Sequence, residues 1–142
     1  MTGFGRILDD LNGAGVRYVL IGGIALIRHG VVRATRDIDA VLDPDPDNVE
    51  RIRALVDKWG ATRLSVPHGD LDLLSEAAAG MAFSDLLERS ETRHIDGVEA
   101  PICSLADLVA MKRSVGRERD LVDLADLELA HGDLPDSRTS SP

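Results

Sequence analysis

The order of apolar and polar residues predicts short helices that alternate with short strands. Apolar residues recur at helical spacing over residues 4–14, and a mostly apolar run covers residues 16–21. Such a run is typical of a strand that is covered on both faces. Gly22-Gly23 interrupts the run, and residues 24–29 resume a helical pattern that ends before a further glycine.

The segment 35–42 is predicted to be the second strand, and its alternation is the most informative pattern in the chain. Asp37 and Asp39 alternate with Ile38 and Ala40, so both carboxylates lie on one face of the strand. The apolar neighbours favour a central strand. The alternative is a solvated edge strand, where acidic residues discourage aggregation.

Downstream, the same patterns predict a further series of helices and strands. In chain order these are a helix at 47–59 capped by Asp47, strands at 62–66 and 70–74, a helix at 81–88, strands at 92–95 and 98–102 in a hairpin around Asp96-Gly97, and helices at 105–115, capped by Ser104, and at 118–130. We therefore expect an α/β (α+β) fold, in which a mixed β-sheet is flanked by helices and followed by a C-terminal helical pair. One domain should span residues 1–131, and the polar residues 132–142 should form a disordered tail.

Composition narrows the class of protein. The chain has 142 residues, a net charge of −9, one Trp, one Tyr and two Phe, so Leu, Val, Ile and Ala must build the core. The negative charge disfavours a protein that coats nucleic acid, although an acidic chain can keep a local basic cleft. The single Cys103 excludes an internal disulfide framework. Asp9-Asp10 interrupts the N-terminal segment, and the longest apolar stretch, 18–27, is too short to span a bilayer. We expect a cytoplasmic protein with no membrane partner.

Gly22-Gly23 at a strand-to-helix junction is compatible with a phosphate site. Without Cβ atoms, the backbone N–H groups can approach a phosphate closely, and the start of the following helix adds positive potential. A tight turn explains the same pair equally well. The glycines alone therefore do not identify a ligand.

The carboxylates of Asp37 and Asp39 are a more demanding feature, because like charges repel in a partly dry site. A divalent cation reverses this repulsion, and hard oxygen ligands suit Mg²⁺. Two such ions can clamp the attacking and leaving oxygens of phosphoryl transfer, usually with a third carboxylate. Asp70 and Asp72 share one face of the next strand. We favour Asp72, which lies toward the apolar end of that strand, whereas Asp70 lies beside a turn.

The spacing of these residues resembles the signature of a known superfamily. Gly22-Gly23, thirteen further residues and then Asp37-Ile38-Asp39 are similar to the polymerase-β-like nucleotidyltransferases. The segment is most similar to their AbiEii-type, toxin-like branch, whose pattern resembles Gly-Gly-x-Ala-Leu-x-x-x-Gly and then Arg-x-Thr-x-Asp-Ile-Asp. Residues 104–121 resemble that branch's helix pair, Leu-Ile-x-x-Lys and then Gly-Arg-x-Lys-Asp, with Arg119 in place of the usual lysine. The likeness covers residues 16–130.

The resemblance implies a Mg²⁺-dependent enzyme that moves a nucleoside monophosphate from a nucleoside triphosphate, such as ATP, to an acceptor hydroxyl. Pyrophosphate would be the second product. The residues implied are Asp37, Asp39 and Asp72 as catalytic metal ligands, and Gly22, Gly23, Lys112 and Arg36 as triphosphate-binding groups.

Several charged residues keep two interpretations. Periodicity alone predicts equally well that Lys112 is a surface lysine with a buried stem. Arg33 and Arg36 could neutralise phosphate or could pair with Asp37 and its neighbours. Asp120 could orient Lys112 or Arg117 by ion pairing.

The acceptor stays open among RNA, protein and a small molecule such as an antibiotic with a hydroxyl group. The branch resemblance implies the toxin of a toxin–antitoxin pair, with an antitoxin as partner. The alternative function is a non-catalytic module of such a system, which binds a nucleotide or a partner without transfer.

Overall fold

The computed structural model describes residues 3–59, 65–66, 69–74 and 80–135, with side chains described for 3–59 and 80–135. In chain order the elements are α1 (Gly3–Gly13), β1 (Tyr18–Ile21), α2 (Gly22–Arg28), β2 (Asp37–Leu42), α3 (Pro46–Trp59), β3 (Ser65–Val66), β4 (Gly69–Leu74), α4 (Phe83–Arg89), β5 (Glu91–Ile95), β6 (Val98–Ile102), α5 (Leu105–Val115) and α6 (Glu118–His131). The expected α/β (α+β) fold is confirmed.

Among the described residues, six strands form one mixed sheet in the order β3-β4-β2-β1-β6-β5. β1 runs antiparallel to β2 and parallel to β6, and β2 runs parallel to β4. The outer strands β3 and β5 each pair antiparallel with their neighbours. The strand that carries Asp37 and Asp39 is therefore interior, as its apolar residues predict, and the edge-strand alternative is wrong.

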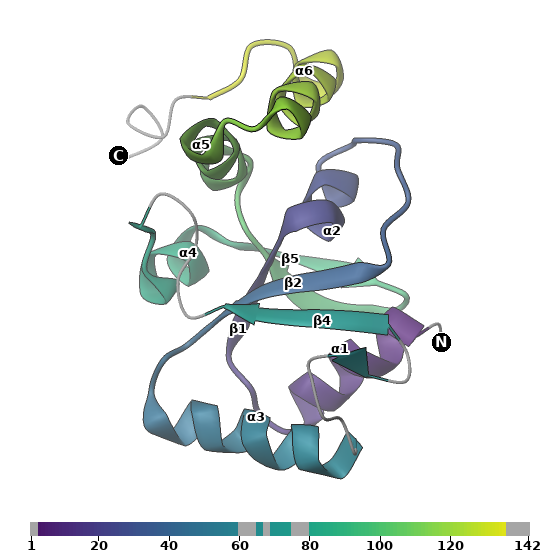
Figure 1. Cartoon of the computed structure of the whole chain (residues 1–142), viewed down its shortest axis with the longest axis vertical. Coiled ribbons are helices and arrows are strands. Elements are labelled where there is room, and N and C mark those ends of the chain that lie inside the picture. Colours follow the sequence, from purple (N-terminus) through teal and green to yellow (C-terminus); the bar gives the residue numbers. More distant parts are fainter. Residues whose placement is uncertain (1–2, 60–64, 67–68, 75–79, 136–142) are drawn as a thin grey trace.

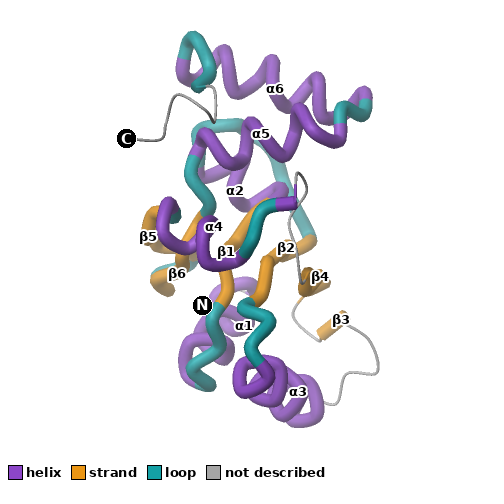
Figure 2. Tube along the Cα trace, turned by 90° about the vertical axis from the view of Figure 1, so that its left-hand side faces the viewer, coloured by secondary structure: helices purple, strands orange, loops and turns teal. Residues whose placement is uncertain are grey.

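The helices cover both faces of the sheet. Figures 1 and 2 agree that α2, α5 and α6 lie on one side of the sheet, while α1 and α3 lie on the other. All four residues of β1 are buried, since the strand is covered on both faces. The core is aliphatic, and its largest fully buried side chains are Ile7, Leu8, Leu11, Leu20, Leu26, Ile38, Leu86, Ile102, Leu108, Leu127 and Val19.

Local turn and cap signals form as the sequence predicts. Asp96 and Gly97 both have positive φ, 52° and 80°, which is the turn geometry that joins β5 to β6 with two residues. Ser104 Oγ accepts a hydrogen bond of 3.1 Å from the backbone N–H of Asp107 and so caps α5. Gly116, at φ 64°, ends that helix and allows α6 to pack back against it.

The start of α3 differs from the prediction. The helix begins at Pro46, one residue before Asp47, so Asp47 lies inside the first turn and does not cap it. Its carboxylate instead pairs with Arg17 at 3.0 Å. Proline is favoured at the first helical position because the N–H it lacks would have no partner there.

Asn48 secures this helix to the sheet. Its side chain is fully buried, and its Oδ1 accepts a hydrogen bond of 2.8 Å from the backbone N–H of Arg17. Its Nδ2 donates to the carbonyls of Arg17, at 3.0 Å, and of Asp43, at 2.9 Å. The side chain thus gives the backbone N–H of Arg17 its partner just before β1. It also adds a second bond to the Arg17 carbonyl, which accepts another of 3.2 Å from the backbone N–H of Asp43.

Two predictions, the strand at 62–66 and the tail at 132–142, lie partly outside the described residues. The strand at 62–66 is described only at Ser65–Val66, and β4 extends the predicted 70–74 strand by one residue. Residues 136–142 of the expected tail are not described. Within the described part of the chain, every helix is too short or too polar to cross a bilayer.

Asn48→Ala should destabilise the fold by about 2 kcal/mol, because it removes three hydrogen bonds and leaves the part-buried backbone N–H of Arg17 without the partner that Asn48 supplies. Urea unfolding followed by circular dichroism would measure this loss. Glu50→Ala on the same helix removes only an exposed pair with Arg53 and is the matched control. Equal stability of the two variants would contradict the assigned role of Asn48.

Candidate active site

Gly22 lies directly against the carboxylate of Asp39. The register pairs Ile21 with Asp39, so the residue after β1 reaches the side chain of Asp39. Gly22 has φ 68°, and a Cβ at this position would lie 2.3 Å from Asp39 Oδ2. Only glycine satisfies both the backbone angle and this close approach.

Gly23 makes a second close approach to the same wall. A Cβ at Gly23 would lie 2.9 Å from Thr35 Oγ1. That hydroxyl accepts a bond of 3.3 Å from the backbone N–H of Asp37 and donates one of 3.2 Å to its carbonyl. The two glycines therefore hold the start of β2, and with it both acidic residues, against α2.

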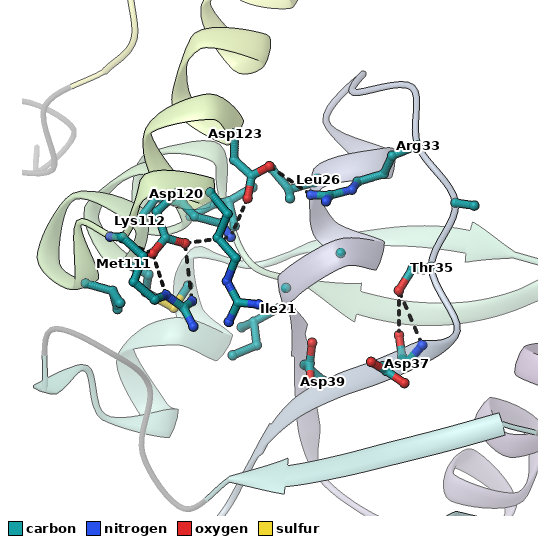
Figure 3. A pocket seen from close by; sticks show the side chains of 17 residues that line it. Ile21, Leu26, Arg33, Thr35, Asp37, Asp39, Met111, Lys112, Asp120 and Asp123 are labelled. Atoms are coloured by element: carbon teal, nitrogen blue, oxygen red, sulfur yellow. Dashed lines mark hydrogen bonds and ion pairs between the residues drawn. The ribbon is translucent and has the colours of Figure 1, made fainter.

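Asp37 and Asp39 line one side of a cavity of about 450 Å³. Figure 3 shows both carboxylates on the same face of β2, with Asp37 exposed and Asp39 half-buried. Parallel pairing sets the backbone of Asp72 opposite Asp39 and that of Asp70 opposite Asp37. The side chains of Asp70 and Asp72 lie outside the described part of the chain. Within that part, no cluster of three metal-ligating side chains occurs.

A cationic wall faces these acids from the α5–α6 pair. The ammonium of Lys112 donates to Asp120 Oδ1 at 3.2 Å and to Asp123 Oδ2 at 2.9 Å. Arg117 Nε donates to Asp120 Oδ2 at 2.8 Å, and the backbone N–H of Arg117 donates to the same oxygen. Asp120 accepts hydrogen bonds from Arg117 and from Lys112. These bonds, those from Arg117 most of all, lower the pKa of Asp120 well below its usual range.

Asp123 joins this wall to the segment before β2. Its Oδ1 accepts a bond of 2.8 Å from Arg33 Nη1, so one buried carboxylate holds both Lys112 and Arg33. The sequence left open whether Arg33 neutralises phosphate or pairs near Asp37. In the structure it pairs with Asp123 of α6. Arg36 is exposed and does not line the cavity, unlike the other residues expected to bind triphosphate.

The cavity also has an apolar part. Its full lining comprises Ile21, Gly22, Gly23, Leu26, Arg33, Ala34, Thr35, Asp37, Asp39, Leu108, Met111, Lys112, Val115, Arg117, Arg119, Asp120 and Asp123. Carboxylates of β2 and basic groups of α5–α6 thus stand on opposite sides of an aliphatic surface (Figure 3). Such an arrangement suits a ligand that has both a polyanionic and a less polar part.

Sequence reasoning missed Asp123. Its only local signal is its position three residues after Asp120, on the same helix face. The partner that gives it a role, Arg33, is ninety residues away in the chain. Both aspartates are buried, at 1% and 5% exposure, which is unusual for acids unless they are paired.

The residues His29, His131 and Cys103 do not line the cavity, and their contacts are structural. His29 is buried and shares a hydrogen bond of 2.8 Å with the carbonyl of Cys103. His131, near the end of α6, bonds the carbonyl of His29 and so fastens that helix to α2. Burial raises the pKa of the Cys103 thiol to about 12, so this thiol is not a nucleophile at neutral pH.

Comparison with known proteins gives a consistent picture. Residues 7–132 match the protein family described as "Nucleotidyltransferase of unknown function (DUF6036)". A comparison with curated protein sequences finds no significant match.

Solved structures with this fold are similar over most of their length. The lincomycin-bound lincosamide antibiotic adenylyltransferase LnuA is 17% identical, with a TM-score of 0.62 over 89% of this chain and 94% of that one. The antibiotic-resistance factor ANT(2'')-Ia is 13% identical, with a TM-score of 0.63 over 92% and 83%. A nucleotidyltransferase-like antigen of Paracoccidioides brasiliensis is 16% identical, with a TM-score of 0.58 over 87% and 71%. At these identities the likeness establishes the fold.

Gly22→Ala should destabilise the protein, because the left-handed backbone alone costs an L-residue about 1–2 kcal/mol and the new methyl meets Asp39. Gly13→Ala is the matched control, since it lies in a helix with nothing within 4 Å of the added Cβ. Thermal unfolding would measure both variants. Unchanged stability in Gly22→Ala would contradict the close packing of Gly22 on Asp39.

The lowered pKa of Asp120 predicts a pH dependence of stability. The folded pKa lies below the unfolded value of about 3.9, so ionised Asp120 stabilises the fold fully above that pH. This contribution is lost as the pH falls through the folded pKa. Asp120→Asn should therefore lose less stability than wild type between about pH 4 and pH 2, as measured by urea unfolding.

Asp126→Asn controls for the loss of one charge on the same helix. In the described part of the chain its carboxylate has no hydrogen bond or ion pair, so its acid profile should follow that of wild type. An Asp120→Asn profile that also follows wild type would overturn the ion-pair role of Asp120.

Proposed function

Since the chain belongs to the DUF6036 family of nucleotidyltransferases, we propose that it transfers a nucleoside monophosphate from a nucleoside triphosphate to an acceptor hydroxyl with Mg²⁺. The observation that carries this proposal is the contact of Gly22 with Asp39, opposite the cationic wall. It sets a glycine turn beside two carboxylates in one cavity. This is the combination that a metal-bound triphosphate requires.

The chemistry of the donor set fits Mg²⁺. Asp37 and Asp39 offer carboxylate oxygens on one face of β2, and the backbone of Asp72 stands beside Asp39 in the sheet. We assign these three residues as the metal ligands. Bound Mg²⁺ would supply charge neutralisation and would polarise the phosphoryl group that is transferred.

The other groups of the cavity bind and orient the substrate. Among the described residues, two of the three Lys112 ammonium protons have carboxylate partners, so the third can donate to a phosphate oxygen. The backbone of Gly22 and Gly23 is open to the cavity on the acidic side. Arg119, which also lines it, adds positive charge for the outer phosphates.

Transfer then needs one displacement at the α-phosphorus. A bond forms between the acceptor oxygen and this phosphorus, the bond to the bridging oxygen breaks, and pyrophosphate leaves with that electron pair. The acceptor proton moves to a carboxylate oxygen of the Asp37 and Asp39 pair. Most of the rate enhancement would come from positioning and electrostatic stabilisation.

The sequence motifs support a more specific class of nucleotidyltransferase. The segments 22–39 and 104–121 support an AbiEii-like enzyme, the toxin of a toxin–antitoxin pair that acts in the cytoplasm. One neighbour, LnuA, is named an adenylyltransferase, and another, ANT(2'')-Ia, is in complex with adenylyl-2"-tobramycin. These names support ATP as donor and a small molecule as one class of acceptor. RNA and protein are the other classes that the experiment below separates.

Asp39→Asn should lower the transfer of label from an α-labelled nucleoside triphosphate by about 100-fold or more, because a charged ligand of the metal becomes a neutral amide. Cell extract supplies acceptors, and fractionation shows whether label enters RNA, protein or small molecules. Asp57→Asn, an exposed aspartate of α3 away from the cavity, is the matched control.

Two outcomes would overturn this function. Equal transfer by Asp39→Asn and wild type would remove the carboxylate pair from the chemistry. Calorimetry that finds Mg²⁺-dependent nucleotide binding by wild type, without transfer under any condition, would replace the enzyme with a nucleotide-binding module.

A further inference from the structure

Arg33 enters the candidate active site from a different part of the fold than the other cations. Among the described residues that line the cavity, the remaining basic side chains belong to the α5–α6 pair and are Lys112, Arg117 and Arg119. Arg33 belongs to the segment between α2 and β2, two residues before Thr35. Figure 3 shows its guanidinium turned toward Asp123. The segment that leads into the acidic strand therefore adds a cation of its own to the cavity.

The carboxylate of Asp123 holds this guanidinium and the ammonium of Lys112 at the same time. Its Oδ1 accepts a hydrogen bond of 2.8 Å from Arg33 Nη1, and its Oδ2 accepts one of 2.9 Å from Lys112 Nζ. The side chain of Asp123 is only 7% exposed, so water screens these ion pairs weakly. Two like charges are thereby fixed next to each other, although they would repel without the carboxylate between them.

Asp120, the other buried acid of α6, has a more local arrangement. Both the backbone N–H and the guanidinium of Arg117, three residues before it, donate to its carboxylate. Asp120 therefore forms part of the start of α6. The partners of Asp123 lie on α5 and on the segment before β2. Its contacts thus orient cavity cations that come from two other elements.

The guanidinium of Arg33 keeps donors for a ligand. A guanidinium carries five N–H groups, and among the described residues Asp123 takes one of them. The side chain is 41% exposed, so the remaining donors can reach a molecule in the cavity. Their planar fork matches the oxygens of a phosphate group.

The charge of the network also favours an anion. Three basic side chains, those of Arg33, Lys112 and Arg117, share two buried carboxylates, those of Asp120 and Asp123. One positive charge is left over when every ion pair is counted. A bound phosphate would balance it.

We propose that Arg33 binds a phosphate of the nucleoside triphosphate and that Asp123 is the positioning residue that aims Arg33 and Lys112 at it together. This inference rests on the proposed function, which supplies the triphosphate. Because both cations are held in place before the substrate arrives, binding requires little rearrangement of their side chains.

Arg33→Gln tests the first half of the proposal. The Michaelis constant for ATP with Mg²⁺ should rise about tenfold, and kcat should stay within about twofold, because the lost contact is the same in the ground state and the transition state. Calorimetry with ATP and Mg²⁺ should show the same rise in the dissociation constant. Arg33→Lys, which keeps the charge and loses the fork, should lie between the two. Arg53→Gln, which removes an exposed arginine of α3, is the matched control.

Asp123→Asn tests the positioning role, because an amide of the same shape cannot accept from both cations through two charged oxygens. It should weaken ATP binding in the wild-type background and have a smaller effect in the Arg33→Gln background, since its partner is then absent. Asp126→Asn controls for the loss of charge on α6. Circular dichroism shows that each variant is folded. Equal effects of Asp123→Asn in the two backgrounds would overturn the positioning role.

The binding of phosphate by Arg33 has its own contradiction. An Arg33→Gln variant with an unchanged dissociation constant for ATP would limit Arg33 to fastening α6 and would overturn the proposal. Calorimetry needs no transfer, so it decides the roles of Arg33 and Asp123 even where wild type transfers no label and the proposed reaction fails. A wild-type chain that binds no ATP in the presence of Mg²⁺ would overturn both.

Discussion

The missing side chain of Gly22 lets the backbone at the end of β1 lie against the carboxylate of Asp39. Because β1 and β2 are antiparallel neighbours, the turn after one strand meets the acidic start of the other. Gly23 extends the contact through Thr35, whose hydroxyl bonds both backbone groups of Asp37. This one close approach sets the direction of α2, the positions of both carboxylates and the opening of the cavity.

The opposite wall depends on buried ion pairs. Desolvation makes a buried charge costly unless partners and hydrogen bonds compensate for it. Asp120 and Asp123 meet that condition, because each accepts hydrogen bonds from more than one basic side chain. The network fastens α6 to α5 and to the segment before β2. It thereby sets the distance between the basic groups and the carboxylates across the cavity.

Local signals explain which parts of this structure the sequence predicts. The Asp96-Gly97 turn, the Ser104 cap and the alternation around Asp37 each depend on residues a few positions apart, so periodicity and turn chemistry reveal them. Asp72 is different. The sheet register sets its backbone beside Asp39, but its side chain lies outside the described part of the chain.

The contacts that sequence reasoning missed are all non-local. Asn48 bonds Arg17, thirty-one residues away, and Asp123 bonds Arg33, ninety residues away. The residue type alone does not predict such a partner, because asparagine and aspartate in a helix are more often exposed. For the same reason the sequence predicts Asp47 as a cap. Its carboxylate instead pairs with Arg17, which comes close only because α3 packs on the sheet.

Charge separation within the cavity reconciles a strongly acidic chain with a polyanionic substrate. The chain carries a net charge of −9, yet the cavity is lined by four basic and four acidic side chains. Two of those acids, Asp120 and Asp123 of α6, already neutralise neighbouring basic groups. The basic wall therefore keeps an excess of positive charge, and β2 keeps an excess of negative charge. A free triphosphate would meet repulsion on the second side, whereas one that carries a divalent cation complements both. Affinity for the nucleotide should therefore depend on the metal even though the basic wall contains no metal ligand.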